Sequence, residues 1–186
     1  MGFSAIVLAA GMGKRMGGNF PKVLFELKGK SLVDYVTDSL TLLQCDKIIL
    51  VIGFGKELVK AHYADSDVTF AVQEVQRGTA DAVTSAIPMI SELSDEIFVL
   101  CGDVPLIPVE TLNDMLKFHR KNELSATVLT VELNDAGKYG RIVRNNNGFI
   151  EKIVEAADAS KEELKIKEIN SGTYIFNKNA LIDNIS

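Results

Sequence analysis

The chain has 186 residues, of which 47% are hydrophobic and 24% charged, with a formal net charge of −5. This composition excludes a disordered or fibrous chain and suffices for one sizeable core. The sequence has no dense lysine or arginine run and no long apolar stretch, so we expect neither nucleic acid nor a membrane as partner. Cys45 and Cys101 are too few and too far apart for a zinc motif or a disulfide framework, which favours a cytoplasmic location.

Short apolar runs alternate with helical patterns over the first part of the chain. Nearly continuous apolar runs predict strands covered on both faces, as in a parallel sheet, at 5–9, 47–52, 68–72 and 96–100. Apolar residues at helical spacing predict helices that begin at the N-cap Ser31, span 56–63, begin at Thr79 and surround 112–119. This alternation predicts an α/β fold whose ligands lie at the carboxyl ends of the strands.

The pattern changes after Ser125. Asn147-Gly148 predicts a hairpin turn, and the apolar runs nearby predict strands at 126–133, 140–144, 149–155 and 171–176, before a short helix at 177–186. We therefore expect a single domain over 1–186. Its nucleotide-type half would span 1–124, and antiparallel strands in 125–186 would enclose a second ligand.

The glycine-rich stretch after the first strand has three interpretations. A dinucleotide fingerprint beginning at Gly11-x-Gly13 fails because Met16 occupies the third glycine position. A P-loop ending in Gly29-Lys30-Ser31 fails because Leu24 occupies the leading glycine position. The third interpretation is a loop that wraps a triphosphate, and the alternative to all three is an ordinary surface turn.

The triphosphate interpretation rests on the charges that follow the glycines. Glycines allow backbone N–H groups to approach phosphate oxygens closely. Arg15 offers a planar fork for phosphate, and Lys22 offers a movable point charge after Pro21, which restricts the backbone. A buried strand that leads into glycines, arginine and Pro-Lys favours phosphate binding over a surface turn.

Two further polar residues end predicted strands. Asp103 follows the run at 96–100, and the residues alone leave a metal ligand and a turn residue equally open. Gln73 carries an amide that donates and accepts at once, which suits the imide edge of a pyrimidine, although glutamine is also common at solvated strand ends.

Several motifs, taken in order along essentially the whole chain, resemble those of sugar-phosphate nucleotidyltransferases. They are similar in particular to the uridyltransferase domain of the bifunctional bacterial N-acetylglucosamine-1-phosphate uridyltransferase/glucosamine-1-phosphate acetyltransferase family. The matching stretches are "LAAGMGKRM…PKVL", "QEVQRGTADAV", "CGDVPLI", "YGRIVR", "IVEAADA" and "INSG".

The resemblance implies a role for each matched position. Arg15 and Lys22 would act on the reacting phosphates as the catalytic charges, and Asp103 would hold Mg²⁺. The nucleotide would contact Leu8, Ala9, Ala10, Gly11, Gly13, Lys22, Gln73, Gly78 and Thr79. The amino sugar would contact Gly140, Glu155 and Asn170, which makes 125–186 the sugar-binding half.

The implied reaction joins UTP and N-acetylglucosamine 1-phosphate into UDP-N-acetylglucosamine, a cell-wall and lipopolysaccharide precursor, with release of pyrophosphate. The family's domain continues beyond this length, with a second Mg²⁺ ligand and a β-helix acetyltransferase domain. We therefore expect a truncated, monomeric domain of a trimeric parent, with weak Mg²⁺ binding and low turnover.

The resemblance has departures and leaves alternatives. Asp81 stands where the family frequently has histidine, which puts an acid near the expected nucleotide edge, so we leave it out of the site. One alternative is another sugar-1-phosphate nucleotidyltransferase, which a substrate panel distinguishes. The other is a non-catalytic module that binds nucleotide sugars, which binding measured beside pyrophosphate release distinguishes.

Overall fold

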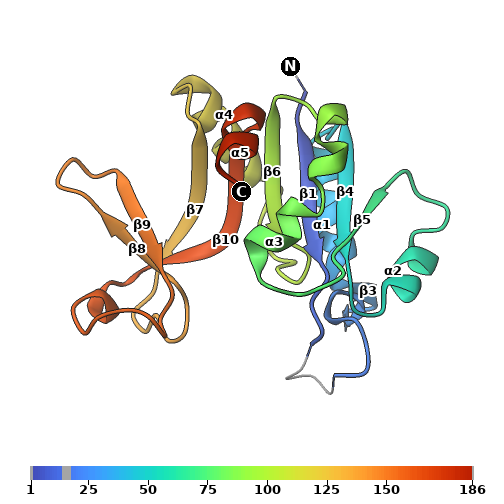
Figure 1. Ribbon diagram of the computed structural model, residues 1–186, viewed down its shortest axis with the longest axis horizontal. Helices are drawn as coiled ribbons and strands as arrows, with labels where there is room; N and C mark the ends of the chain where they lie inside the picture. Colours follow the sequence, from blue (N-terminus) through green and yellow to red (C-terminus); the bar gives the residue numbers. More distant parts are fainter. Residues whose placement is uncertain (1, 14–17, 186) are drawn as a thin grey trace. The chain divides into compact units, whose positions relative to one another are not determined.

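The computed structural model describes residues 2–13 and 18–185, and the chain divides into two compact units. Unit 1 comprises Met1–Thr127 and Tyr174–Ser186, and unit 2 comprises Val128–Thr173. Strand β10 (Glu168–Asn177) contributes to both units because a unit boundary falls within it (Figure 1).

Unit 1 is built on a mostly parallel sheet in which β6, β1 and β4 lie side by side (Figure 1). The strands run in the order β5-β4-β1-β6, and all three pairings between them are parallel, as the apolar runs predict. The end of β10 adds an antiparallel edge, with Tyr174 opposite Val99. The four parallel strands are β1 (Ser4–Ala9), β4 (Lys47–Ile52), β5 (Thr69–Val72) and β6 (Glu96–Cys101).

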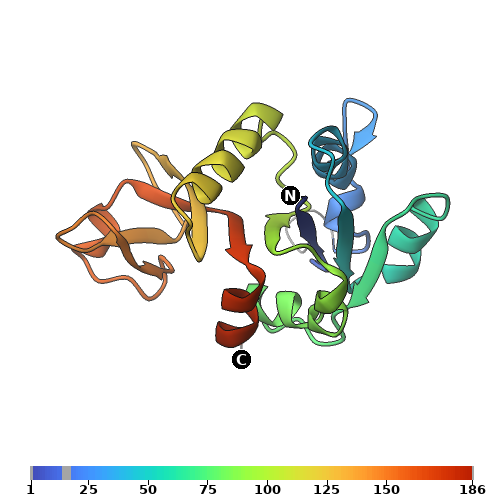
Figure 2. The same ribbon diagram turned by 90° about the horizontal axis from the view of Figure 1, so that it is seen from above.

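Helices cover both faces of this sheet. Figure 2 shows α1 (Leu32–Leu42) and α4 (Val109–Lys121) on one face, and α3 (Thr79–Thr84) and α5 (Lys178–Asn184) on the other. The remaining helix, α2 (Lys56–His62), follows β4. Ser31 caps α1 as predicted, because its side chain accepts a hydrogen bond from the Asp34 amide at 3.3 Å. Within the described ranges, each helix is too short or too polar to span a bilayer.

Two local elements differ from the sequence-based expectation. The helix that begins at Thr79 ends at Thr84, and a 3₁₀ segment, η3 (Ile87–Glu92), replaces its predicted continuation. Pro88 explains the break, since it lacks an amide hydrogen and its ring disfavours the preceding helical turn. A hairpin of β2 (Glu26–Leu27) and β3 (Lys30–Ser31) was not predicted.

The hairpin explains the Gly-Lys-Ser stretch that mimics a P-loop. Gly29 adopts φ of 80° in the turn between β2 and β3, where glycine meets no steric penalty. Pro21 is followed directly by a short 3₁₀ segment, η2 (Lys22–Leu24).

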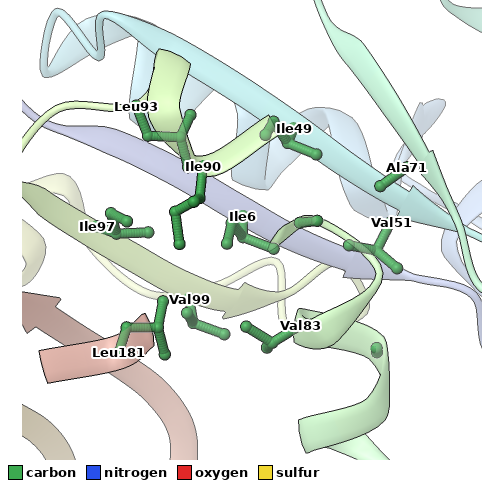
Figure 3. Close-up of a cluster of buried hydrophobic side chains, with 12 residues drawn as sticks. Ile6, Ile49, Val51, Ala71, Val83, Ile90, Leu93, Ile97, Val99 and Leu181 are labelled. Carbon is green, nitrogen blue, oxygen red and sulfur yellow. The ribbon is translucent and has the colours of Figure 1, made fainter. Parts of the chain in front are cut away.

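One part of the core of unit 1 lies between the sheet and the elements on the α3 side. Figure 3 shows Ile6 of β1 at the centre, with Val83 of α3 and Leu181 of α5 packed toward the strands. Ile6, Ile49, Val51 and Ile97 are each 0% exposed, so the central strands are dry on this face. Burying such side chains stabilises the fold by about 1.5–3 kcal/mol each.

Unit 2 is an antiparallel arrangement. It contains most of β7 (Ala126–Glu132), with β8 (Arg141–Arg144), β9 (Ile150–Val154), the 3₁₀ segment η4 (Glu163–Lys165) and the first part of β10. The hairpin predicted at Asn147-Gly148 is confirmed, since β8 pairs antiparallel with β9 and Gly148 adopts φ of 82° in the turn. Ile169 of β10 lies opposite Arg141 of β8. The assignment of 1–124 and 125–186 to separate ligands stays a prediction.

The core predicts the cost of a cavity. Ile6→Ala should lower the free energy of unfolding by about 2–5 kcal/mol, because the rigid strands around Ile6 cannot collapse into the space. Denaturant titration followed by circular dichroism measures this loss. Ile182→Ala, at a position that is 40% exposed on α5, is the control and should change stability by under about 1 kcal/mol. Equal effects of the two variants would contradict this assignment of the core.

Candidate active site

The parallel pairing of β1 with β6 builds the first part of the site. Leu8 lies opposite Cys101, and the Gly102 amide donates to the Leu8 carbonyl at 2.9 Å. The loops that leave the two strands therefore begin at the same edge of the sheet. This edge carries the carboxyl ends of the strands, where ligands of open α/β sheets bind.

Lys22 and Asp103 form an ion pair at this edge. Gly13 lies against the same lysine, since a Cβ built on Gly13 would stand 3.3 Å from the Lys22 Cβ. The structure thus brings together three of the residues expected to hold the phosphates and the metal. Arg15, the other expected catalytic charge, lies outside the described residues.

A second part of the site is a hollow of about 440 Å³ at the ends of β1, β4 and β5. Three loops line it. Met12 belongs to the first loop, which follows β1, and Gly53 and Phe54 belong to the second, which follows β4. Val72–Gln76 form the end of β5 and the start of the third loop. Gly53 is required sterically, because a Cβ there would stand 2.9 Å from the Ala10 Cβ and 3.1 Å from the Gln73 carbonyl oxygen. The hollow is adjacent to the Leu8–Gly11 segment, which was expected to hold the base and ribose.

Gln73 directly follows β5 at the start of the third loop and is buried, with only 5% of it exposed. Its Nε2 donates to an Asp81 carboxylate oxygen at 2.7 Å and to the Gly78 carbonyl at 3.3 Å. Gln76 donates from its Nε2 to the Ala10 carbonyl at 2.7 Å and so joins the third loop to the first. The site predicted from the residues and motifs did not include Gly53, Gln76 or Asp81.

The helix predicted to begin at Thr79 does begin at this residue, but Thr79 is not its N-cap. Gly78 occupies the N-cap of α3 with φ of 130°, and glycine has no side chain that could cap the first turn. Thr79 is instead the first helical residue and is exposed. Glycine is suited to this N-cap because residues with a Cβ rarely adopt that φ.

The three expected sugar contacts lie together in unit 2. The backbone N–H of Asn170 donates to the Gly140 carbonyl at 2.9 Å. A Cβ built on Gly140 would stand 3.3 Å from the Glu155 Oε1, so the glycine leaves room for this exposed carboxylate. Neighbouring Arg141 is buried and fixes the approach to Gly140 by donating to the carbonyls of Ala136, Gly137 and Tyr139.

Asp103 is the residue at the edge of the sheet that suits a divalent cation. Its carboxylate is 25% exposed, and Mg²⁺ takes oxygen ligands such as one or two carboxylates together with waters and substrate phosphates. Within residues 2–13 and 18–185, no group of three histidine, cysteine or acidic residues has a metal-binding arrangement. A cation held by Asp103 would therefore fit as one shared with substrate phosphates.

The two cysteines lack nucleophilic character. Burial raises the pKa of Cys101 to about 11, with a further increase from Asp103 and an opposing effect of Lys22. Burial raises the pKa of Cys45 to about 12. Both thiols are therefore protonated near neutral pH, and the chemistry at this edge depends on charge and position.

A parallel sheet with a glycine-rich loop, a lysine and an acid at its carboxyl edge defines a nucleotidyltransferase class of domain. The chain belongs to the MobA-like NTP transferase domain family, whose model matches residues 5–164. The resemblance that the sequence motifs indicated is thereby confirmed at the level of the family.

Curated relatives carry the name bifunctional protein GlmU. The protein from Listeria welshimeri serovar 6b is 43% identical over 179 residues, covering 96% of this chain and 39% of the relative. The protein from Brevibacillus brevis is 45% identical over 177 residues, covering 95% of this chain and 38% of the relative. The chain thus spans about two fifths of the length of these relatives.

Solved structures support the fold class. A UDP-glucose pyrophosphorylase complexed with UDP-glucose aligns with a TM-score of 0.75 and 18% identity, covering 96% of this chain and 77% of that chain. At this identity the likeness concerns the fold, which agrees with the expected Rossmann-like nucleotidyltransferase architecture.

The raised thiol pKa values predict slow alkylation. At pH 8, Cys101 in the folded protein should react with iodoacetamide roughly 10²-fold more slowly than in the unfolded chain, because only the thiolate reacts. A time course in buffer and in urea, with each cysteine followed by mass spectrometry, measures both rates. Equal rates in the two solvents would show that the folded site does not raise the Cys101 pKa.

Proposed function

We propose that this domain transfers a uridylyl group from UTP to N-acetylglucosamine 1-phosphate, forming UDP-N-acetylglucosamine and pyrophosphate. The observation that carries the proposal is the meeting of Lys22 and Asp103 at the carboxyl edge of β1 and β6. The choice of substrates rests on the relatives named GlmU and on the matched motifs. Because the chain spans only part of those relatives, their substrates remain a proposal here.

The reaction needs positioning and charge more than a general base. A phosphate oxygen of the sugar phosphate forms a bond to the α-phosphorus of UTP, and the bond to the β-phosphate oxygen breaks as pyrophosphate leaves. The attacking oxygen is already an anion at neutral pH, so no residue has to remove a proton. Preorganised positive charge can contribute most of such a rate enhancement.

Lys22 supplies that charge from the chain itself. Its ammonium group is paired with Asp103 and its backbone lies in η2, which would place the charge beside the expected triphosphate. Mg²⁺ held by Asp103 and the substrate phosphates would supply further charge neutralisation. Gly13, next to Lys22, leaves the backbone open to phosphate oxygens.

The base and the sugar are assigned to separate residues. The hollow lined by Gln73 and Gly53 would take the uracil. Glu155 and Asn170 in unit 2 would accept from and donate to sugar hydroxyls, which suits a carboxylate and an amide.

A substrate panel tests the proposal. Pyrophosphate release should be fastest with UTP and N-acetylglucosamine 1-phosphate, compared with glucose 1-phosphate and with CTP, ATP or dTTP. Calorimetry with UTP and UDP-N-acetylglucosamine should show binding of both. Faster release with another sugar phosphate would assign that sugar phosphate as the substrate. Binding without pyrophosphate release from any pair of nucleotide and sugar phosphate would favour a non-catalytic module.

Loss of the Lys22 charge should slow the reaction. Lys22→Ala should lower kcat/KM for UTP by roughly 10² or more, as for removal of one preorganised electrostatic group. Steady-state pyrophosphate release measures the effect.

The matched control is Lys47→Ala. Lys47 also forms an ion pair, with Glu92, but it begins β4 and so lies at the amino end of that strand. This variant should keep the kcat/KM of the original chain. Similar losses of kcat/KM in the two variants would show that Lys22 acts only through the net charge or the folding stability of the domain.

The sugar assignment predicts a selective effect on KM. Glu155→Ala should raise KM for N-acetylglucosamine 1-phosphate by about 10- to 100-fold, the usual cost of losing a hydrogen bond to a charged group. KM for UTP should not change. The control is Glu151→Ala, an exposed acid on β9 that should leave both KM values unchanged. Equal increases in both KM values for Glu155→Ala would mark the residue as structural.

A further inference from the structure

We infer that Asp81 is a positioning residue that makes the base hollow selective for an imide N–H, as in uracil or thymine. The inference rests on the proposed function, because it concerns how the nucleotide base is read. Asp81 was left out of the predicted site because it puts an acid near the expected nucleotide edge. In the structure its carboxylate faces Gln73, the residue expected to read the base.

The contact is specific about which end of the amide it holds. A carboxylate has no proton to donate, so it accepts hydrogen bonds only. The group that meets Asp81 at 2.7 Å is therefore the Gln73 amide nitrogen. The second N–H of the same nitrogen is directed to the Gly78 carbonyl at 3.3 Å.

Both donors of the Gln73 side chain are thereby occupied. Over the described part of the chain, its Oε1 accepts no hydrogen bond, and Gln73 lines the hollow at the ends of β1, β4 and β5. Rotating the amide by 180° would place this oxygen against the Asp81 carboxylate and the Gly78 carbonyl. Two such acceptor-to-acceptor contacts in a buried place are costly, so the amide has one orientation.

A fixed acceptor selects the base that it meets. Uracil and thymine carry an N–H at ring position 3 and can donate to Oε1, whereas neutral cytosine has an acceptor there. A buried site built to accept a hydrogen bond rejects a ligand that lacks the donor much more strongly than an adaptable site does. An amide free to rotate would present its nitrogen to cytosine and lose this discrimination.

The test measures the ratio of the affinities for UTP and CTP. Asp81→Asn keeps the size of the side chain but can both donate and accept, so it removes the shorter of the two acceptor contacts that oppose rotation of the Gln73 amide. The ratio of the CTP Kd to the UTP Kd, measured by calorimetry, should fall about 10-fold or more in this variant. Asp81→Asn should change the dTTP Kd in the same direction and by a similar factor as the UTP Kd, because the two bases share the imide.

Two comparisons separate positioning from stability. Asp46→Asn is the matched control: Asp46 accepts from the Ser94 hydroxyl, also at 2.7 Å, but lies just before β4 at the amino end of that strand. It should leave the ratio unchanged. In a Gln73→Ala background, Asp81→Asn should no longer change the ratio, since Asp81 acts through Gln73. Asp81→Ser repeats the test if Asp81→Asn fails to fold.

The outcomes are distinguishable. If the original chain prefers UTP and Asp81→Asn weakens UTP and CTP equally, or changes neither, the inference is overturned while the proposed function stands. If Asp81→Asn changes the ratio equally with and without Gln73, Asp81 does not act through that residue and the inference is also overturned. If the original chain binds no pyrimidine nucleotide, the proposed function fails first and the inference fails with it.

Discussion

The parallel pairing of β1 with β6 is the constraint on which the candidate site depends. Its register sets Leu8 opposite Cys101, so the glycine-rich loop and Asp103 leave the sheet at the same edge. The strands are held in that register by a dry core in which Ile6 and Ile97 are fully buried. A shift of one strand past the other would separate Lys22 from Asp103, so core packing and charge placement are linked in this unit.

The Lys22–Asp103 pair itself contributes little to stability. The two side chains are 36% and 25% exposed, and ion pairs as accessible as this stabilise by only about 0–1 kcal/mol. The small magnitude suits a pair that a substrate must be able to part. The Asp81–Gln73 contact is of the other kind, because it involves a buried amide and opposes rotation of that amide. The Lys22–Asp103 pair is therefore one that a substrate can exchange, and the Asp81–Gln73 contact fixes the direction of a hydrogen bond.

Most of the fold of unit 1 could be predicted because its strands are continuous apolar runs. The predicted strand at 47–52 matches β4, and those at 5–9 and 96–100 differ from β1 and β6 by one residue each. The helix after Thr79 was predicted too long because apolar spacing continues through a proline. The phosphate role of Lys22 was predicted from the residues, whereas the preference for a metal role at Asp103 came from the resemblance. Gly53 was missed and Asp81 was left out of the predicted site, because their contacts depend on which loops approach each other and no local pattern carries that information.

The structure of the complex with UTP and Mg²⁺ is the most direct test of the central claim that this edge of the sheet is a triphosphate and metal site. We expect Asp103 to ligate the cation, Lys22 to leave Asp103 for a phosphate oxygen, and the Gln73 Oε1 to face the uracil N–H. A complex in which Lys22 stays on Asp103 while the triphosphate binds elsewhere would contradict this assignment.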